Sequence, residues 1–272
     1  MSSNTPEPLK SRKFLCLWLL LISALACAAP DGVGEVQEPP PADGYGAWAA
    51  EDPGDWPRIA MVNRIRYSDS DHPMAGSAFL VQNGDEIVAV TAKHVLRYFK
   101  SEAMDSASFR GTLVSWEMFL KDAPTEATVI GALINEDADE SLDNIRTARD
   151  WLLFTVRNPS DNVTPLRLRT TPLVAGEPVA VVGWRYTDEG PQHVYRGKYV
   201  RSEKGSVLID VRELTDNTMP GLSGAPVIDA RGYVIGMMSS KSGKLQRLAS
   251  VDYAKRVLEQ DARPEPVAVL EE

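Results

Sequence analysis

The sequence predicts an all-β domain that ends in a short helix. Short runs rich in Val, Ile, Leu and aromatic residues recur along most of the chain, separated by turn-forming residues, as is typical of successive strands. The pair Asn83-Gly84 lies between two such runs and indicates a hairpin with a type I′ turn. Near the C-terminus, residues 251–260 have the pattern of a helix with Ser250 as its N-cap.

The predicted strands follow one another along the chain. Residues 79–81 and 87–94 form the predicted hairpin, whose second strand leads into a short helical segment at Val95. The strongest aromatic and branched run in the middle of the chain is at residues 151–156. Further strands are expected at residues 59–67, 112–119, 128–134, 178–182, 194–200, 207–211 and 233–238.

Residues 1–26 have the composition of a secretory signal peptide. Lys10, Arg12 and Lys13 precede an apolar stretch at residues 14–26 that ends in small residues. This stretch is shorter than the ~20 residues that a membrane-spanning helix needs. We therefore expect cleavage before Cys27 and an extracytoplasmic protein.

Cys27 raises the question of a lipid anchor. A cysteine at the first position after cleavage, followed by a tether rich in Pro, Gly and Ala, resembles a bacterial lipoprotein, although Ala24 stands where Leu is usual. Cys16 lies inside the signal, so Cys27 has no partner for an intramolecular disulfide. Two alternatives stay open: a lipoprotein of the cell envelope, tethered to a membrane through Cys27, or a secreted protein.

Composition divides the rest of the chain into three parts. Residues 27–56 are rich in Pro and Gly and poor in branched apolar residues, which is typical of a linker or tether. Residues 57–262 are long enough to bury a core and form the predicted domain. Residues 263–272 are expected to be an exposed tail.

Composition also argues against several classes of function. The formal net charge is −9, so binding of nucleic acid through phosphate neutralisation is not expected. The three histidines are scattered and the chain offers no cysteine pair, so no metal site is expected. No glycine-rich phosphate loop follows a predicted strand, and no cofactor is expected.

Residues 221–227 are the most informative stretch of the chain. They place Ser223 between Gly221 and Gly224, in a turn that leads into the apolar strand at residues 226–228. A serine hydroxyl becomes a nucleophile when a base removes its proton and backbone donors stabilise the oxyanion. The flanking glycines allow the N–H groups of Gly221 and Ser223 to converge on one point. Alone, the motif fits an ordinary glycine-rich turn equally well.

The positions of the histidines favour the catalytic interpretation. None of His72, His94 and His193 follows Ser223, whereas the G-x-S-x-G elbow of α/β-hydrolases requires a histidine after its serine. The base would therefore lie upstream. His94 is the best candidate because it ends a buried strand, whereas the other two lie in polar, turn-rich sequence.

Asp150 is the best candidate for the carboxylate that would orient this histidine. It directly precedes the apolar run 151–156, so its side chain can be partly buried against an imidazole. Alone, it is better explained as an ordinary aspartate at a strand edge or in a turn. The other carboxylates of this region form a dense acidic loop and are expected to be solvated: Glu136, Asp137, Asp139, Glu140 and Asp143.

Together these segments resemble the chymotrypsin-fold (trypsin-like) serine peptidases, and most closely their bacterial, HtrA-like branch. The order His94, Asp150, Ser223 along the chain is the order of that family. The resemblance covers roughly residues 57–260, and no PDZ-like second domain is expected. It rests on residues 76–81, 90–95, 150–153, 176–184, 221–227, 232–237 and 249–258.

The resemblance implies two six-stranded antiparallel β-barrels with the active site between them. Ser223 would attack a peptide carbonyl, His94 would take and return the proton, and Asp150 would hold the imidazole. The N–H groups of Gly221 and Ser223 would form the oxyanion hole. The implied activity is that of a serine endopeptidase, which acts on a protein or peptide substrate through an acyl-enzyme intermediate.

The resemblance also implies where a substrate would bind. Met238, Ser239 and Ser240 would form the edge strand that pairs with the substrate backbone. Asn217, six residues before the serine, would lie at the base of the specificity pocket. A neutral residue there argues against selection for Lys or Arg at the cleaved position.

Three residues depart from the family pattern. Leu222 replaces the usual Asp or Asn before the serine, Ala225 replaces a glycine, and Lys93 places a cation beside the predicted base. These departures support an alternative function, that of a catalytically weak trypsin-like domain that binds peptides or serves as a scaffold. Cleavage after Arg58 would create a new N-terminus at Ile59, and its ammonium, once buried, would need a carboxylate partner. Leu222 offers none, so activation by this cleavage is not expected.

Overall fold

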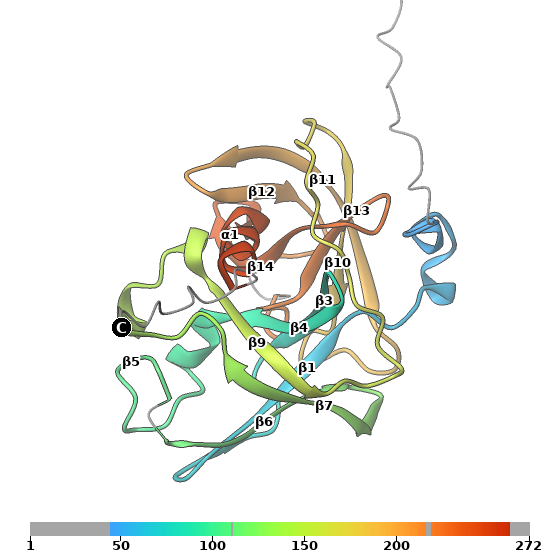
Figure 1. Cartoon of the computed structure of the whole chain (residues 1–272). Helices are drawn as coiled ribbons and strands as arrows, with labels where there is room; N and C mark the ends of the chain where they lie inside the picture. Colours follow the sequence, from blue (N-terminus) through green and yellow to red (C-terminus); the bar gives the residue numbers. More distant parts are fainter. Residues whose placement is uncertain (1–43, 110, 216–218, 262–272) are drawn as a thin grey trace, which may run out of the picture. The chain divides into compact units, whose positions relative to one another are not determined.

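The computed structural model describes residues 44–109, 111–215 and 219–261, which form two β-barrels and a C-terminal helix (Figure 1). The predicted all-β class, the two six-stranded antiparallel barrels and the short C-terminal helix are confirmed. The predicted signal peptide and tail, Cys27 and Asn217 lie outside the described residues.

The first barrel closes because its β1 and β6 strands pair. Its six strands are β1 (Met61–Tyr67), β3 (Ser77–Asn83), β4 (Glu86–Ala92), β6 (Leu113–Leu120), β7 (Ala123–Leu133) and β9 (Trp151–Asn158). They are hydrogen-bonded in the order β1-β3-β4-β9-β7-β6, and β6 returns to β1. A two-residue strand, β2 (Asp71–His72), also pairs with β1, and β5 (Ser106–Ala107) pairs with β8 (Asp137–Ser141) separately.

The second barrel is closed in the order β10-β11-β12-β15-β14-β13. Its strands are β10 (Pro178–Gly183), β11 (His193–Glu203), β12 (Ser206–Asp210), β13 (Pro226–Asp229), β14 (Val234–Ser242) and β15 (Leu245–Ser250). Helix α1 (Val251–Asp261) follows directly, and Ser250 Oγ accepts the Asp252 N–H at 3.3 Å, as expected of an N-cap. In the described part of the chain, no helix has the length and apolar character needed to cross a membrane.

Side-chain patterns explain how the strands are buried. In β6, Trp116, Met118 and Leu120 are buried and alternate with partly exposed residues, as expected for a strand with one face on the core. In β9, residues 151–154 are all buried. Trp151 reaches the second barrel, where its indole N–H donates to the Ser250 carbonyl at 3.0 Å.

The predicted type I′ turn is wrong. Asn83 pairs with Glu86, so the hairpin loop is Gly84-Asp85, with Gly84 at a φ of +58°. Glycine at the first of two loop positions is the pattern of a type II′ turn. The register is set by buried cross-strand pairs such as Phe79 with Val90, which leave Asn83 inside the strand.

Part of the predicted linker packs against the second barrel. The Tyr45 hydroxyl donates to the Gly232 carbonyl at 3.0 Å and accepts the Arg167 N–H at 2.8 Å. The rings of Trp48 and Trp56 pack edge to face, 5.3 Å between centroids. Packing against the domain therefore begins before residue 57, because aromatic side chains outweigh the Pro- and Gly-rich composition of this stretch.

The buried Asn63 forms hydrogen bonds that connect separate segments of the first barrel. Asn63, on β1, is fully buried, and its amide N–H groups donate to the carbonyls of Ala75 and Ser77, both at 3.0 Å. Its Oδ1 accepts the indole N–H of Trp116 at 2.9 Å. The Thr91 hydroxyl also donates to the Ser77 carbonyl at 2.7 Å. These bonds fix the start of β3, from which Ser77 reaches the second barrel.

We expect Asn63→Leu to lower the free energy of unfolding by about 3 kcal/mol or more, because several buried groups lose their hydrogen-bond partner. Denaturant unfolding measures the change. Arg66→Ala, at an exposed position of the same strand, is the control and should shift stability by less than about 0.5 kcal/mol. An Asn63→Leu protein as stable as the control would show that these bonds do not stabilise the barrel.

Candidate active site

Three elements bring His94, Asp150 and Ser223 together. His94 lies in the 3-10 helix η3 (Lys93–Arg97) directly after β4, and Asp150 directly precedes β9. Because β4 and β9 are antiparallel neighbours, the end of one strand lies beside the start of the other. Ser223 lies in the loop before β13, in the second barrel.

A line of short hydrogen bonds joins the three side chains. Asp150 Oδ2 lies 2.7 Å from His94 Nδ1, and His94 Nε2 lies 2.8 Å from Ser223 Oγ. Because an ionised carboxylate can only accept, the ring proton belongs on Nδ1. Nε2 is then the acceptor for the Ser223 hydroxyl, which is the tautomer that a general base needs.

The Asp150 carboxylate is held by three donors. Its side chain is only 1% exposed, and Oδ1 accepts the backbone N–H of His94 at 2.7 Å. Oδ2 accepts the Ser239 hydroxyl in addition to the His94 ring. Ser239 lies at a β-bulge of β14, an irregularity that redirects side chains. These bonds satisfy the buried charge and fix the orientation of the carboxylate.

Residues 219–222 form a turn that orients the Gly221 peptide. The Leu222 N–H donates to the Met219 carbonyl at 3.0 Å, and Gly221 has a φ of +105°. Pro220 at the second position and a glycine of positive φ at the third are the signature of a type II turn. A Cβ at Gly221 would lie 2.6 Å from the Tyr186 nitrogen, so only glycine fits.

Both predicted oxyanion donors are available to a ligand. The Gly221 N–H shares a peptide with the Pro220 carbonyl, which accepts the Tyr186 N–H at 2.9 Å. The Ser223 N–H shares a peptide with the Leu222 carbonyl, which accepts the Ala225 N–H at 2.9 Å. The N–H and C=O of a trans peptide point in opposite directions, so both N–H groups face away from these partners. Within the described residues, neither N–H donates to a protein acceptor.

Ser77 links the serine loop to the first barrel. Its N–H donates to the Ser223 carbonyl and its hydroxyl to the Gly221 carbonyl, both at 2.7 Å. Gly224 permits this approach, because a Cβ there would lie 2.1 Å from the Ser77 carbonyl oxygen. Its φ of +90° also favours glycine.

The family model of the trypsin-like peptidase domain matches residues 76–237, which include His94, Asp150 and Ser223. The chain belongs to this family. The predicted resemblance to trypsin-like peptidases is confirmed.

A solved structure shares the fold of this trypsin-like peptidase domain. The Rv3671c protease from M. tuberculosis, in its active form, superposes with a TM-score of 0.50 at 13% sequence identity, over 77% of this chain and 83% of that chain. At this identity the likeness concerns the fold alone. No curated protein matches the chain in sequence.

Two departures from the family pattern lie in the apolar core of the second barrel. Leu222 is fully buried in a cluster that includes Val181 and Val227. Ala225 belongs to the same cluster, and its carbonyl accepts the Met238 N–H at 3.0 Å. Neither side chain disturbs the turn at Gly221.

The third departure, Lys93, carries a charge that is paired. The side chain is fully buried, and its ammonium forms an ion pair with Glu140, whose carboxylate also lies 3.9 Å from the Arg149 guanidinium. The prediction that the whole acidic loop is solvated is therefore wrong for Glu140. A buried ammonium requires a partner, and this carboxylate, only 12% exposed, supplies it.

The predicted substrate-binding residues differ in their surroundings. Met238 does not fit a role in backbone pairing, because its N–H and C=O already bind Ala225 and Gly224, both at 3.0 Å. From Ser239 onward, no strand within the described residues pairs with the edge of β14 that faces away from β15. Ser240 lies on this stretch, so the open edge begins one residue later than predicted.

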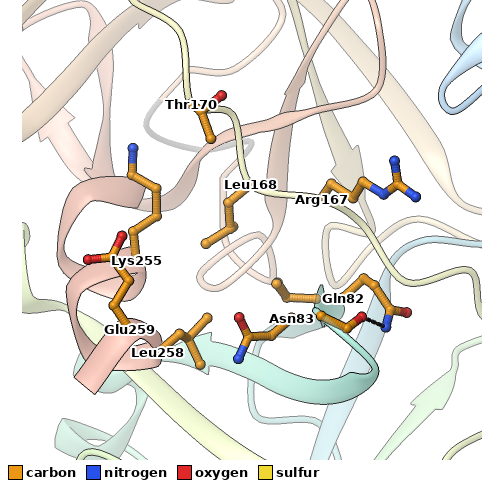
Figure 2. Close-up of a pocket in the computed structure, with 10 residues that line it drawn as sticks. Gln82, Asn83, Arg167, Leu168, Thr170, Lys255, Leu258 and Glu259 are labelled. Atoms are coloured by element: carbon orange, nitrogen blue, oxygen red, sulfur yellow. Dashed lines mark hydrogen bonds between the residues drawn. The ribbon is translucent and has the colours of Figure 1, made fainter. Parts of the chain in front are cut away.

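Other parts of the molecule do not extend this site. A cavity of about 430 Å³ is lined by the β3–β4 hairpin, by helix α1 and by Arg167, Leu168 and Thr170 (Figure 2). None of the predicted site residues lines it. Among the described residues, no group of three or more His, Cys, Asp or Glu side chains could hold a metal ion.

Sequence reasoning missed two contributors to this site. Pro220 precedes Gly221, and the pair Pro-Gly is a recognisable signal for a type II turn. Ser77 has no comparable signal, because its contact with Gly221 joins residues 144 positions apart.

We expect Glu140→Ala to lower the free energy of unfolding by about 3 kcal/mol or more, because Lys93 becomes a buried, unpaired ammonium. The double variant Lys93→Met/Glu140→Ala removes both charges and should recover most of the loss. Denaturant unfolding of both variants gives the comparison. A double variant as unstable as Glu140→Ala would count against this explanation.

Proposed function

We propose that this trypsin-like peptidase domain is a serine endopeptidase that uses Ser223 as nucleophile, His94 as general base and Asp150 as its orienting carboxylate. The observation that carries the proposal is the unbroken hydrogen-bonded line of 2.7 and 2.8 Å through the three side chains. A structural serine in a glycine-rich turn would need no such line.

The reaction would proceed by acyl transfer. His94 Nε2 takes the Ser223 proton as Oγ attacks the peptide carbonyl, and Asp150 stabilises the imidazolium that forms. The carbonyl oxygen becomes an oxyanion bound by the N–H groups of Gly221 and Ser223, each worth about 3 kcal/mol. His94 then gives its proton to the leaving amine, and water, activated by the same base, hydrolyses the acyl-enzyme.

The substrate would be a protein or peptide that binds as an additional strand. The open edge of β14 from Ser239 to Ser240 offers backbone groups for this mode of binding. The pocket that would select the side chain at the cleaved bond includes Asn217 in this proposal. The predicted export signal and Cys27 extend the proposal to an enzyme of the cell envelope or exterior.

The alternative, a catalytically weak peptide-binding or scaffolding domain, rested on Leu222, Ala225 and Lys93. The first two side chains lie in an apolar core, and the charge of Lys93 is paired with Glu140. None of them displaces a group of the hydrogen-bonded line, so the geometry favours the peptidase.

We expect the purified protein to react covalently with a fluorophosphonate probe, and Ser223→Ala and His94→Ala to abolish the reaction. His193→Ala is the matched control, because this histidine lies on β11 and bonds to the Glu189 carbonyl. Gel fluorescence and mass spectrometry of the labelled peptide give the readout. A folded wild-type protein without label, or a labelled Ser223→Ala variant, would refute the proposed mechanism.

We expect activity without cleavage after Arg58. Ile59 is fully buried, and its backbone N–H donates to Gln192 Oε1 at 2.9 Å, while Leu222 provides no carboxylate for a new ammonium. The Arg58→Gln variant should therefore be labelled at the wild-type rate. N-terminal mass analysis of labelled protein that found only chains beginning at Ile59 would contradict this expectation.

A further inference from the structure

We propose that Lys121 is a positioning residue for the oxyanion hole, acting through residues 185–188. The inference rests on the proposed function. Lys121 lies in the turn between β6 and β7 of the first barrel, whereas residues 185–188 follow β10 of the second barrel, beside the serine loop.

The Lys121 ammonium donates hydrogen bonds to three carbonyls of residues 185–188. Nζ donates to the carbonyls of Arg185 at 3.2 Å, Tyr186 at 3.1 Å and Asp188 at 2.6 Å. A lysine ammonium has three N–H donors, so these contacts use all of its hydrogen-bonding capacity. They hold the segment in a tight arc whose carbonyls face the first barrel.

The opposite side of the same arc holds the oxyanion turn. The Tyr186 N–H donates to the Pro220 carbonyl at 2.9 Å. This bond fixes the peptide between Pro220 and Gly221, and the planarity of that peptide turns the Gly221 N–H away from Tyr186. If the peptide flipped, the Pro220 carbonyl would replace the Gly221 N–H in the oxyanion hole, and the Tyr186 N–H would lose its acceptor.

The second barrel also holds the two ends of the arc. The Asp188 carboxylate accepts the Arg185 backbone N–H and Nε, both at 2.8 Å, and the Tyr195 hydroxyl. Burial acts to raise the pKa of Asp188, but the hydrogen bonds from Arg185 and Tyr195 outweigh it and lower the pKa to about 2. Asp188 therefore links the two ends of the arc to Tyr195 of the second barrel, whereas Lys121 holds the carbonyl of Tyr186 between these ends.

The backbone of Tyr186, and not its ring, carries the effect. Tyr186 as a whole is 44% exposed, and its backbone N–H is the group that donates to Pro220. Burial raises the pKa of Tyr186 and outweighs a hydrogen bond between its hydroxyl and the neighbouring Gly76 backbone, which acts to lower that pKa. Asp122→Ala is the control, since Asp122 lies on the same turn as Lys121 but pairs with Arg58 instead.

The test compares the full-length wild type with Lys121→Met in two measurements. Hydrogen exchange of the Tyr186 amide should become at least about tenfold faster in Lys121→Met. The rate constant for fluorophosphonate labelling should fall at least about tenfold, as expected when one oxyanion donor is partly lost. With a peptide substrate, kcat should fall while KM changes little, and Lys121→Arg should recover part of the rate. Asp122→Ala should match the wild type.

Unchanged exchange of the Tyr186 amide in Lys121→Met would overturn the inference, whatever the activity. So would faster exchange with an unchanged labelling rate. If Lys121→Met does not fold, Lys121→Gln, which keeps fewer donors, is expected to give smaller changes in the same direction. A wild-type protein that reacts with no probe would refute the proposed function, and the amide exchange would then decide the inference alone.

Discussion

Ser77 donates two hydrogen bonds of 2.7 Å to the loop that carries Ser223, and the candidate active site depends on them. The apolar core shared by the two barrels stabilises their contact, but apolar burial has no direction. Hydrogen bonds do have direction, and here they set the position of the serine loop relative to His94. Ser77 is itself held through the buried Asn63. On the other side of the loop, Lys121 holds residues 185–188 against it, so the first barrel positions both flanks of the oxyanion turn.

Buried charge is the second constraint on this site. Asp150 is tolerated in the interior because three donors converge on its carboxylate. The same donors leave the His94 ring in the tautomer that can accept a proton from serine. Lys93 is tolerated because Glu140 turns inward to meet it. Lys93, the residue before His94, therefore holds the acidic loop, and its charge is balanced by Glu140.

The fold was predictable because its signals are local and repeated. Runs such as residues 151–156 and the Ser250 cap stand out in any short window, and three short motifs in the order His94, Asp150, Ser223 were enough to indicate the family. The type of the hairpin turn was not predictable from Asn83-Gly84, because the packing of Phe79 against Val90 determines the register. The contacts of Ser77, Lys121 and Glu140 could not be predicted for another reason: each joins segments that only the folded chain brings together.

In the proposed mechanism, Ser223 and two backbone N–H groups form one catalytic unit. A crystal structure of the protein with a peptide boronic acid would test this unit, because the boronate mimics the tetrahedral intermediate. We predict a covalent bond from Ser223 Oγ to boron and one boronate oxygen about 2.7–3.1 Å from both the Gly221 and Ser223 nitrogens. A boronate that is not bonded to Ser223, or a Pro220 carbonyl turned toward the boronate oxygen, would refute the proposed mechanism.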